Sequence, residues 1–525
     1  MSLALSACVL AAAAALAGAT SDAPAAKPAR VVVVVGNNGG GGSDGHDRPT
    51  LSFADDDAAR LFLQLAPGAT RAWLLTTFDK ESARGFPDLT DIARPPTKEA
   101  LAGALGEAFW VLRQEKERGH PTELVFAFAG HGDVDDSGQG FVVFEDGAFT
   151  RNDLARQVLA PSPADLNHVV VDACSSYFFV KSRGGADDKK GVPLTPQLLD
   201  VLQDSMTPEL ASKTGLIVST SQATEVHESR ALSSGVFSYL LRSALAGGGD
   251  IDGDGKVEYG EAAAFVAAAS AGLDDPRARL QVYAEAPLQR PHTALADLSS
   301  GKDTAFLAVD EPGRVRLLDA RGQPWAEVNS SGPVYVALAG QPFFLVQREH
   351  NNVLEEAVLV PRTGGAWALS SLDFARAPAA RGDAGPFARL FANALDDGFA
   401  RGFWSSSGAL PPASGNPRFV PPFAAGREPA ARLNVGVVGG VVLGASALAG
   451  VGAGAAVIGN QVAFGELDKG FRRTGELDPS KSLEVESWRN AATALTVTSL
   501  GLGLVGGGLF LWSLSLEDGE VGLPW

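Results

Sequence analysis

The sequence predicts an α/β fold: a mostly parallel sheet sandwiched by helices, then a small all-β domain and a C-terminal pair of transmembrane helices. Three observations predict it. Continuous apolar runs such as residues 30–38 alternate with helical segments through the first half of the chain, as in sheets buried on both faces. Short alternating segments follow between residues 296 and 372. Near the C-terminus, two uncharged stretches each exceed the ~20 residues that span a bilayer.

The first 29 residues predict export. Residues 1–19 form an apolar leader that ends in "AGA", a small-x-small pattern that signal peptidase accepts, and residues 20–29 form a Pro/Ala linker. The usual basic region is missing, because no Lys or Arg precedes Lys27. An alternative is lipidation at Cys8, since "LSAC" resembles a lipoprotein cleavage box, although it precedes the apolar run.

Residues 30–290 contain the alternating strands and helices of the predicted sheet. The strands are expected at residues 30–38, 71–78, 123–130, 167–174 and 215–220, with helices between them, for example at 53–65 and 97–119. Active sites in such sheets lie at the carboxyl ends of the strands. Cys174 ends one predicted strand and His131 follows another, so both are expected at that edge.

The rest of the chain divides into a β domain, a connector and a membrane hairpin. Residues 296–375 are expected to form the small all-β domain, and residues 376–432 form a connector rich in Pro, Ala and Gly. Transmembrane helices are expected at 433–459 and 491–514. The loop between them, residues 460–490, carries five Lys or Arg residues, whereas the tail "EDGEVGLPW" carries none, and the positive-inside rule therefore predicts a cytoplasmic loop. The alternative is a pair of buried helices in a soluble domain.

Composition limits the classes of partner. The net charge of −18 disfavours nucleic acid and anionic membrane surfaces as partners. The chain has two cysteines, and Cys8 lies in the leader, so Cys174 would be the only thiol of a processed chain. No intramolecular disulfide is therefore expected.

Cys174 and His131 together suggest nucleophilic chemistry. A single cysteine after an apolar strand is by default a small core residue. His131, however, lies between glycines in "GHG", which keeps the imidazole at a loop mouth and lets a ligand approach the backbone. A thiolate nucleophile needs a base and hydrogen-bond donors for the developing oxyanion. The backbone amides of Gly132 and Cys174 are candidates for those donors.

Residues 30 to about 270 resemble the caspase-like cysteine peptidases of the metacaspase and bacterial branch. Five elements carry the resemblance in order: "VVVVVGNN" with "LSFADDDAARLF", "FAFAGHG", "VVVDACSS", "GLIVST" and "ESRALSSGVFSYLLRSAL". The resemblance implies a His–Cys dyad acting on a polypeptide substrate, with His131 as the general base and Cys174 as the nucleophile.

The resemblance also implies a specificity. Metacaspases cut after Arg or Lys because acidic side chains line the pocket, and Asp57 and Asp172 match those acidic positions. A carboxylate pair is a suitable partner for a guanidinium. The alternatives are helix capping for Asp57 and a strand-end carboxylate for Asp172. The chain departs from the family at Tyr177, where a glycine is usual, and it lacks the "QAC-G" signature of Asp-specific animal caspases.

These readings favour a membrane-anchored cysteine endopeptidase in the bacterial inner membrane, with its catalytic domain facing the periplasm. The family also includes inactive relatives. The second hypothesis is therefore a catalytically inactive caspase-like scaffold that binds proteins at the membrane.

A twelve-residue acidic segment, "DIDGDGKVEYGE", fits the calcium loop of an EF-hand. The expected ligands are Asp250, Asp252, Asp254, Lys256 through its carbonyl, Glu258, and Glu261 as a bidentate ligand. Helical segments flank the loop on both sides, and a structural Ca²⁺ is expected, with no organic cofactor. The alternative is an unoccupied Asp/Gly turn.

Overall fold

The computed structural model describes ten stretches of the chain. They are residues 27–40, 48–135, 139–173, 207–220, 228–273, 280–299, 304–351, 353–377, 389–413 and 418–421. The predicted leader, Cys174 and both predicted transmembrane helices lie outside them. The described residues all belong to one compact unit. Among the described helices, none combines the length and the apolar character needed to cross a bilayer.

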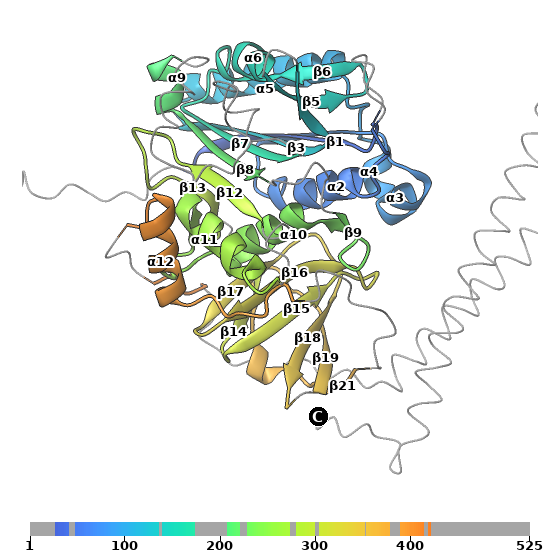
Figure 1. The fold of residues 1–525 in the computed structure, drawn as a ribbon, viewed down its shortest axis with the longest axis vertical. Helices are drawn as coiled ribbons and strands as arrows, with labels where there is room; N and C mark the ends of the chain where they lie inside the picture. The colour runs from blue at the N-terminus through green and yellow to red at the C-terminus, as the bar shows by residue number, and fades with distance from the viewer. Residues whose placement is uncertain are drawn as a thin grey trace, which may run out of the picture. The chain divides into compact units, whose positions relative to one another are not determined.

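A six-stranded, mostly parallel sheet organises the first half of the described chain (Figure 1). Its order is β12-β8-β7-β3-β1-β2, and β12 alone runs antiparallel to its neighbour, β8. The strands are β1 (Ala29–Asn37), β2 (Arg71–Thr76), β3 (Thr122–Gly130), β7 (Leu166–Ala173), β8 (Thr214–Thr220) and β12 (Gln281–Glu285). The predicted α/β class and parallel sheet are confirmed.

Helices cover both faces of this sheet. The helix α5 (Lys98–Glu117) packs with Val31, Val33 and Val35 in one core, while the alternate valines of β1 face the other side. On that side lie α2 (Ala54–Leu65) and α10 (Val236–Ser243), as Figure 1 shows. The continuous valine run forms a strand buried on both faces because helices cover each face.

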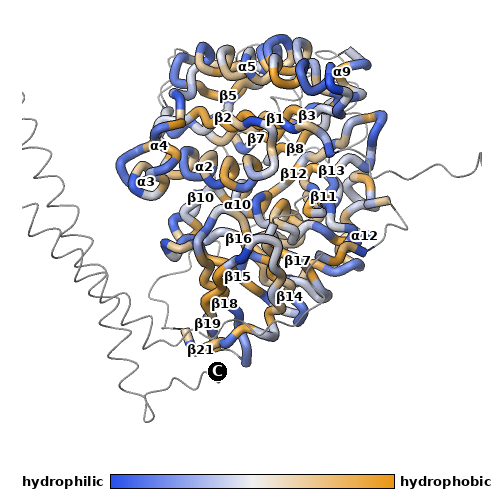
Figure 2. Tube along the Cα trace, turned by 180° about the vertical axis from the view of Figure 1, so that it is seen from behind, coloured by the Kyte–Doolittle hydropathy of each residue, from blue (hydrophilic) through white to orange (hydrophobic). Residues whose placement is uncertain are grey.

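Smaller elements complete this half. The sheet β4-β5-β6 was not predicted, because its strands are short and glycine-rich; it directly follows His131. The smaller elements are β4 (Gly132–Val134), β5 (Gly140–Phe144), β6 (Gly147–Thr150), α3 (Lys80–Gly85), α4 (Pro87–Thr90), α6 (Arg151–Asp153), η1 (Leu154–Leu159), α9 (Pro208–Ser212), β9 (Glu228–Ser229), β10 (Ser234–Gly235), η3 (Ala244–Gly248), β11 (Lys256–Glu258), α11 (Tyr259–Ser270) and β13 (Ala294–Asp297). Figure 2 shows α3 as a mostly hydrophilic segment.

The region after residue 304 is built from two further sheets. Their orders are β17-β14-β20 and β16-β15-β18-β19-β21. The elements are β14 (Ala305–Val309), β15 (Gly313–Leu318), β16 (Pro324–Ser330), β17 (Val334–Leu338), β18 (Phe344–His350), β19 (Val353–Leu359), β20 (Ala366–Ala368), η4 (Leu369–Ser371), β21 (Ala375–Arg376) and, after them, the helix α12 (Asp397–Ser407). Strand β16 packs against α10, so this region contacts the half that carries the large sheet.

Candidate active site

The two predicted catalytic residues follow neighbouring strand ends. Strands β3 and β7 run parallel, and Gly130 pairs with Ala173 at the carboxyl end of both. His131 follows Gly130, and Cys174 follows Ala173 in the sequence but lies outside the described residues. Parallel pairing therefore brings the residues that precede the predicted base and nucleophile into direct register.

The imidazole of His131 has a defined orientation. Its Nε2 lies 2.7 Å from the carbonyl oxygen of Pro49. A carbonyl can only accept, so Nε2 carries the hydrogen and Nδ1 of the neutral ring keeps the lone pair. The side chain is 6% exposed, and burial lowers its pKa, although the Pro49 hydrogen bond opposes this shift. A neutral ring with a free lone pair at pH 7 is suited to act as a base.

The backbone around His131 is held by the small sheet and by β1. Gly130 has φ of +154°, and a Cβ there would lie 2.8 Å from the Asn37 carbonyl oxygen, so glycine is required. The amide of Val143 donates to the His131 carbonyl at 2.9 Å, and Asn37 Nδ2 donates to the Val143 carbonyl at 2.8 Å. Gly132, the predicted oxyanion donor, begins β4 and pairs with Val142.

The two predicted acidic residues, Asp57 and Asp172, meet at Gly235. A Cβ on Gly235 would lie 3.0 Å from Asp172 Oδ2 and 3.1 Å from Asp57 Oδ2. Asp57 accepts from the Gly235 amide at 2.7 Å and from the Ser234 hydroxyl. Asp172 accepts from the amide and the hydroxyl of Ser238, at 3.1 and 2.6 Å. Residues that are far apart in the sequence thus form a carboxylate pair at the start of α10.

These two carboxylates have different surroundings. Asp57 is 3% exposed, and burial raises its pKa to about 7 against the lowering effect of the Arg242 guanidinium. Asp57 does not cap α2, because it lies inside that helix, whose N-cap residue is Phe53. Its side chain accepts hydrogen bonds from the start of α10. Asp172 is only partly buried at the end of β7. Asp172 is therefore the more accessible carboxylate of the pair.

A third carboxylate, which no sequence motif marks, lies at this edge. Glu228 accepts from the amides of Ser52 and Phe53, at 2.8 to 3.0 Å, immediately before α2. The first amides of α2 itself donate to Asn38 Oδ1. Burial raises the pKa of Glu228, and the charges of Asp172 and Asp55 add to that rise. The segment "VHESR" has no periodic pattern, so no sequence signal places Glu228 here.

The acidic loop brings three of its predicted ligands together. One carboxylate oxygen from each of Asp250, Asp252 and Asp254 lies within 4.8 Å of the others. Gly253 and Gly255 have φ of +77° and +82°, which makes the sharp turn possible. Asp250 is 7% exposed; its Oδ2 accepts from the Gly255 amide at 3.0 Å, while its Oδ1 has no hydrogen-bond partner among the described residues.

The other predicted ligands lie outside this group of three in the part of the chain described. Glu261 is fully buried and accepts from the amides of Ile251 and Glu258, both at 2.9 Å. Glu258 lies 3.1 Å from Nδ1 of His292, and Lys256 begins β11. Burial raises the pKa of Asp250 to about 7 and that of Glu261 to about 9. Carboxylates are the ligands that a hard cation such as Ca²⁺ or Mg²⁺ prefers.

The connector after α12 contacts this loop. The Phe419 amide donates to the Gly253 carbonyl, and a Cβ on Gly255 would lie 2.5 Å from Phe419 Cγ. The ring of Phe419 packs edge-on against Phe306, with centroids 5.6 Å apart. Trp404 Nε1 donates to the Gly260 carbonyl at 2.9 Å. The loop is therefore held by a segment that lies more than 140 residues further along the chain.

Comparison with known proteins leaves the family open. No family model matches the chain, and no curated protein matches it. A crystal structure of a Geobacter sulfurreducens protein aligns with a TM-score of 0.29 and 14% identity, covering 49% of this chain and 92% of that one. At that TM-score, the likeness says nothing about function.

Proposed function

We propose that this protein is a membrane-anchored, caspase-like cysteine endopeptidase that uses His131 and Cys174 as a dyad and cleaves after Arg or Lys. The observation that carries the proposal is the register of Gly130 with Ala173, together with the Pro49 carbonyl that orients His131. The mostly parallel sheet between helices is the architecture that the caspase-like resemblance implies. It supports the proposal at the level of fold.

The proposed chemistry follows from the orientation of His131. Nδ1 takes the proton of the Cys174 thiol, and the thiolate attacks the scissile carbonyl carbon, so that a C–S bond forms. Backbone amides at Gly132 and Cys174 stabilise the oxyanion. The imidazolium gives its proton to the leaving amine as the C–N bond breaks. Water, deprotonated by the same nitrogen, then hydrolyses the thioester and restores the thiol.

Specificity for a basic residue is supported by the charge at the strand edge. Asp172, together with Asp57 and Glu228 in their ionised forms, places negative charge around the start of α10. An Asp side chain of a substrate would be repelled there, whereas a guanidinium would be attracted. Asp172 is the proposed direct contact.

The proposal includes a structural cation and an anchor. Asp250, Asp252 and Asp254, with Glu261 and Glu258 nearby, would hold a Ca²⁺ that neutralises the loop. The anchor would be the hairpin of residues 433–514, with the catalytic half in the periplasm.

The test uses the full chain in detergent with reporter peptides that carry Arg, Lys or Asp before the scissile bond. Hydrolysis of the Arg and Lys peptides, lost in Cys174→Ala and in His131→Ala, is expected. No hydrolysis, together with no labelling of Cys174 by an Arg-directed activity probe, would favour the scaffold hypothesis instead.

A further inference from the structure

The start of α10 is contacted by the large sheet and also by the two sheets that follow residue 304, which we call the β region (residues 304–377). A three-residue segment, Ser233–Gly235, carries the hydrogen bonds to Asp57 and lies beside Asp172. Ser233 has φ of +47°, a left-handed conformation that a serine adopts only when its surroundings hold it there. The groups that hold Ser233 therefore determine where the carboxylate pair lies.

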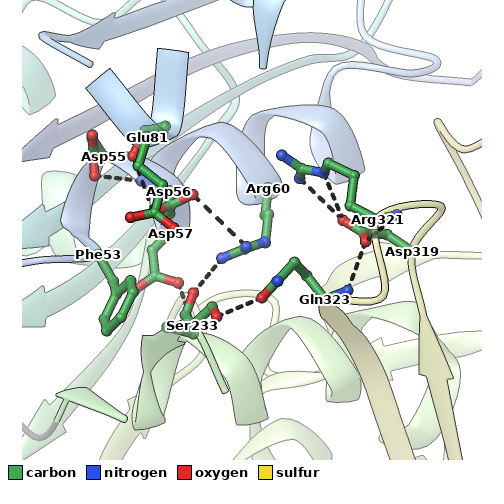
Figure 3. A network of polar contacts seen from close by, with 12 residues as sticks. Phe53, Asp55, Asp56, Asp57, Arg60, Glu81, Ser233, Asp319, Arg321 and Gln323 are labelled. Atoms are coloured by element: carbon green, nitrogen blue, oxygen red, sulfur yellow. Dashed lines mark hydrogen bonds and ion pairs between the residues drawn. The ribbon is translucent and has the colours of Figure 1, made fainter. Parts of the chain in front are cut away.

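Two groups from different elements hold Ser233 (Figure 3). Arg60 Nη1 donates to the Ser233 carbonyl, and the Ser233 hydroxyl donates to Gln323 Oε1. Arg60 is 2% exposed and lies in α2, three residues after Asp57. Gln323 comes from the β region, immediately before β16.

The turn that carries Gln323 is itself rigid. The Gln323 amide donates to Asp319 Oδ1 at 2.8 Å, and the Asp319 amide donates to the Gln323 carbonyl at 2.8 Å. Arg321 lies 3.0 Å from Asp319 Oδ2, and its guanidinium lies 4.3 Å from the centre of the Phe86 ring. Asp319 is fully buried. The turn is closed internally and also anchored to the segment that carries Phe86.

A second contact from β16 reaches the same segment. Arg242 of α10 donates to the Trp325 carbonyl at 3.0 Å and to the Ser234 hydroxyl at 3.3 Å. Ser234 in turn donates to Asp57. The β region thus contacts Ser233 directly, through Gln323. It contacts Ser234 indirectly, because the Trp325 carbonyl accepts from Arg242 of α10, which also donates to Ser234.

We infer that Gln323 is a positioning residue for the two carboxylates proposed to bind the substrate, Asp57 and Asp172. The β15–β16 turn, through Gln323, holds Ser233 in place. Ser233 in turn sets the position of Ser234–Gly235, beside which both carboxylates lie. The β region is then an integral part of the specificity pocket. This inference rests on the proposed function in taking that carboxylate pair as the site for the substrate cation.

The test compares Gln323→Ala with Gln323→Glu, which keeps the oxygen acceptor, and with Gln347→Ala as a matched control. Gln347 lies on β18, where it donates to Glu356 at 2.8 Å. Loss of one hydrogen bond should raise KM for Arg reporters roughly threefold to tenfold in Gln323→Ala, with kcat and the kinetics of neutral reporters within twofold of the parent. Gln323→Glu and Gln347→Ala should stay within twofold in all parameters.

A binding measurement separates this inference from the proposed function. Benzamidine, a planar amidinium, is titrated by calorimetry into the Cys174→Ala chain with and without Gln323→Ala. A Kd raised roughly threefold to tenfold by Gln323→Ala supports the inference, even if the parent protein hydrolyses no reporter and the peptidase proposal fails. An unchanged Kd and KM, no benzamidine binding at all, or an equal loss with every reporter alongside a lower melting temperature would overturn it.

Discussion

The strand edge around His131 and the acidic loop around Asp250 are both rich in carboxylates, yet they are built in different ways. At the strand edge, the groups come from α2, β3, β7 and α10, and protein donors occupy the carboxylates. In the loop, all the carboxylates lie within twelve residues, and Asp250 Oδ1 has no donor among the described residues. The carboxylates of the first region are balanced by protein donors, whereas in the second at least one carboxylate oxygen is not.

This difference determines what each region should respond to. A carboxylate that already accepts hydrogen bonds from the protein needs no ion to stabilise the folded state, and it can still contribute to substrate binding. Three carboxylates within 4.8 Å repel one another unless a cation or protons neutralise them. Substitution of His131 or Asp172 at the edge should therefore alter kinetics, and substitutions in the loop should alter stability.

The largest effect is expected at the dyad. His131→Ala should lower kcat by roughly 10³-fold or more, because the general base is lost. His131→Gln is the matched variant, since its side-chain amide can still donate to the Pro49 carbonyl but cannot act as a base. It should be equally inactive, with a melting temperature closer to that of the parent. Substantial activity in either variant would remove His131 from the chemistry.

The second-largest effect distinguishes the roles of Asp172 and Asp57, the two carboxylates beside Gly235. Asp172→Asn should lower kcat/KM for Arg reporters roughly 100-fold, because truncating a charged pair at a partly buried site costs several kcal/mol. Neutral reporters should change less than threefold, since the amide still accepts from Ser238. Asp57→Asn should mainly lower the melting temperature, because Asp57 is buried among protein donors. If both reporter classes lose activity equally in Asp172→Asn, the specificity assignment is wrong.

The third effect tests the loop by thermal melting of the full chain. A cation that binds only the folded form adds about 2.7 kcal/mol at a hundredfold excess over Kd, which should raise the melting temperature by a few degrees. Magnesium should do much less, since it prefers a tighter octahedron. Asp250→Asn and Glu261→Gln should remove most of the gain, and Glu117→Gln, on the exposed face of α5, should not. Superimposed melts with calcium and with chelator would exclude the site.

The smallest effect concerns pH. Burial lowers the pKa of His131 below its ordinary 6.5, so more than half of the folded protein keeps the neutral base at pH 6.5. The acid limb of kcat/KM should therefore have its midpoint below 6.5. Because the unfolded chain binds more protons at that residue, its contribution to stability should also fall as the pH drops below 6.5. A kinetic midpoint above 6.5 would contradict the burial of this ring.

Much of the large sheet was predictable because burial on both faces leaves a strong signal. Strand β1, predicted at 30–38, spans Ala29–Asn37, and the other four predicted strands agree within two residues at each end. The segment of strand β16, "PWAEVNS", has no clear strand pattern, because it contains a fully buried charge, Glu327, where that pattern requires an apolar residue. That charge is held by Arg314, Arg316 and the Tyr239 hydroxyl, which no local pattern reveals.

The candidate site was predictable only where its residues lie in short motifs. The "GHG" segment and the acidic loop are local, so their residues could be named from the sequence. Pro49, Glu228 and Gln323 act through contacts between segments more than 80 residues apart, and they have no motif. Tertiary packing alone makes them neighbours of the site.

The contact of Phe419 with the acidic loop has a mechanical consequence. The Phe419 amide donates a hydrogen bond to the Gly253 carbonyl, and the Phe419 ring packs against Phe306 and Tyr335. Phe419 lies in the last described stretch, residues 418–421. Tension applied to the chain beyond residue 421 would thus load the loop before it reached the large sheet. A cation bound in the loop would then stabilise this attachment, and the force needed to detach the connector would depend on the free concentration of that cation.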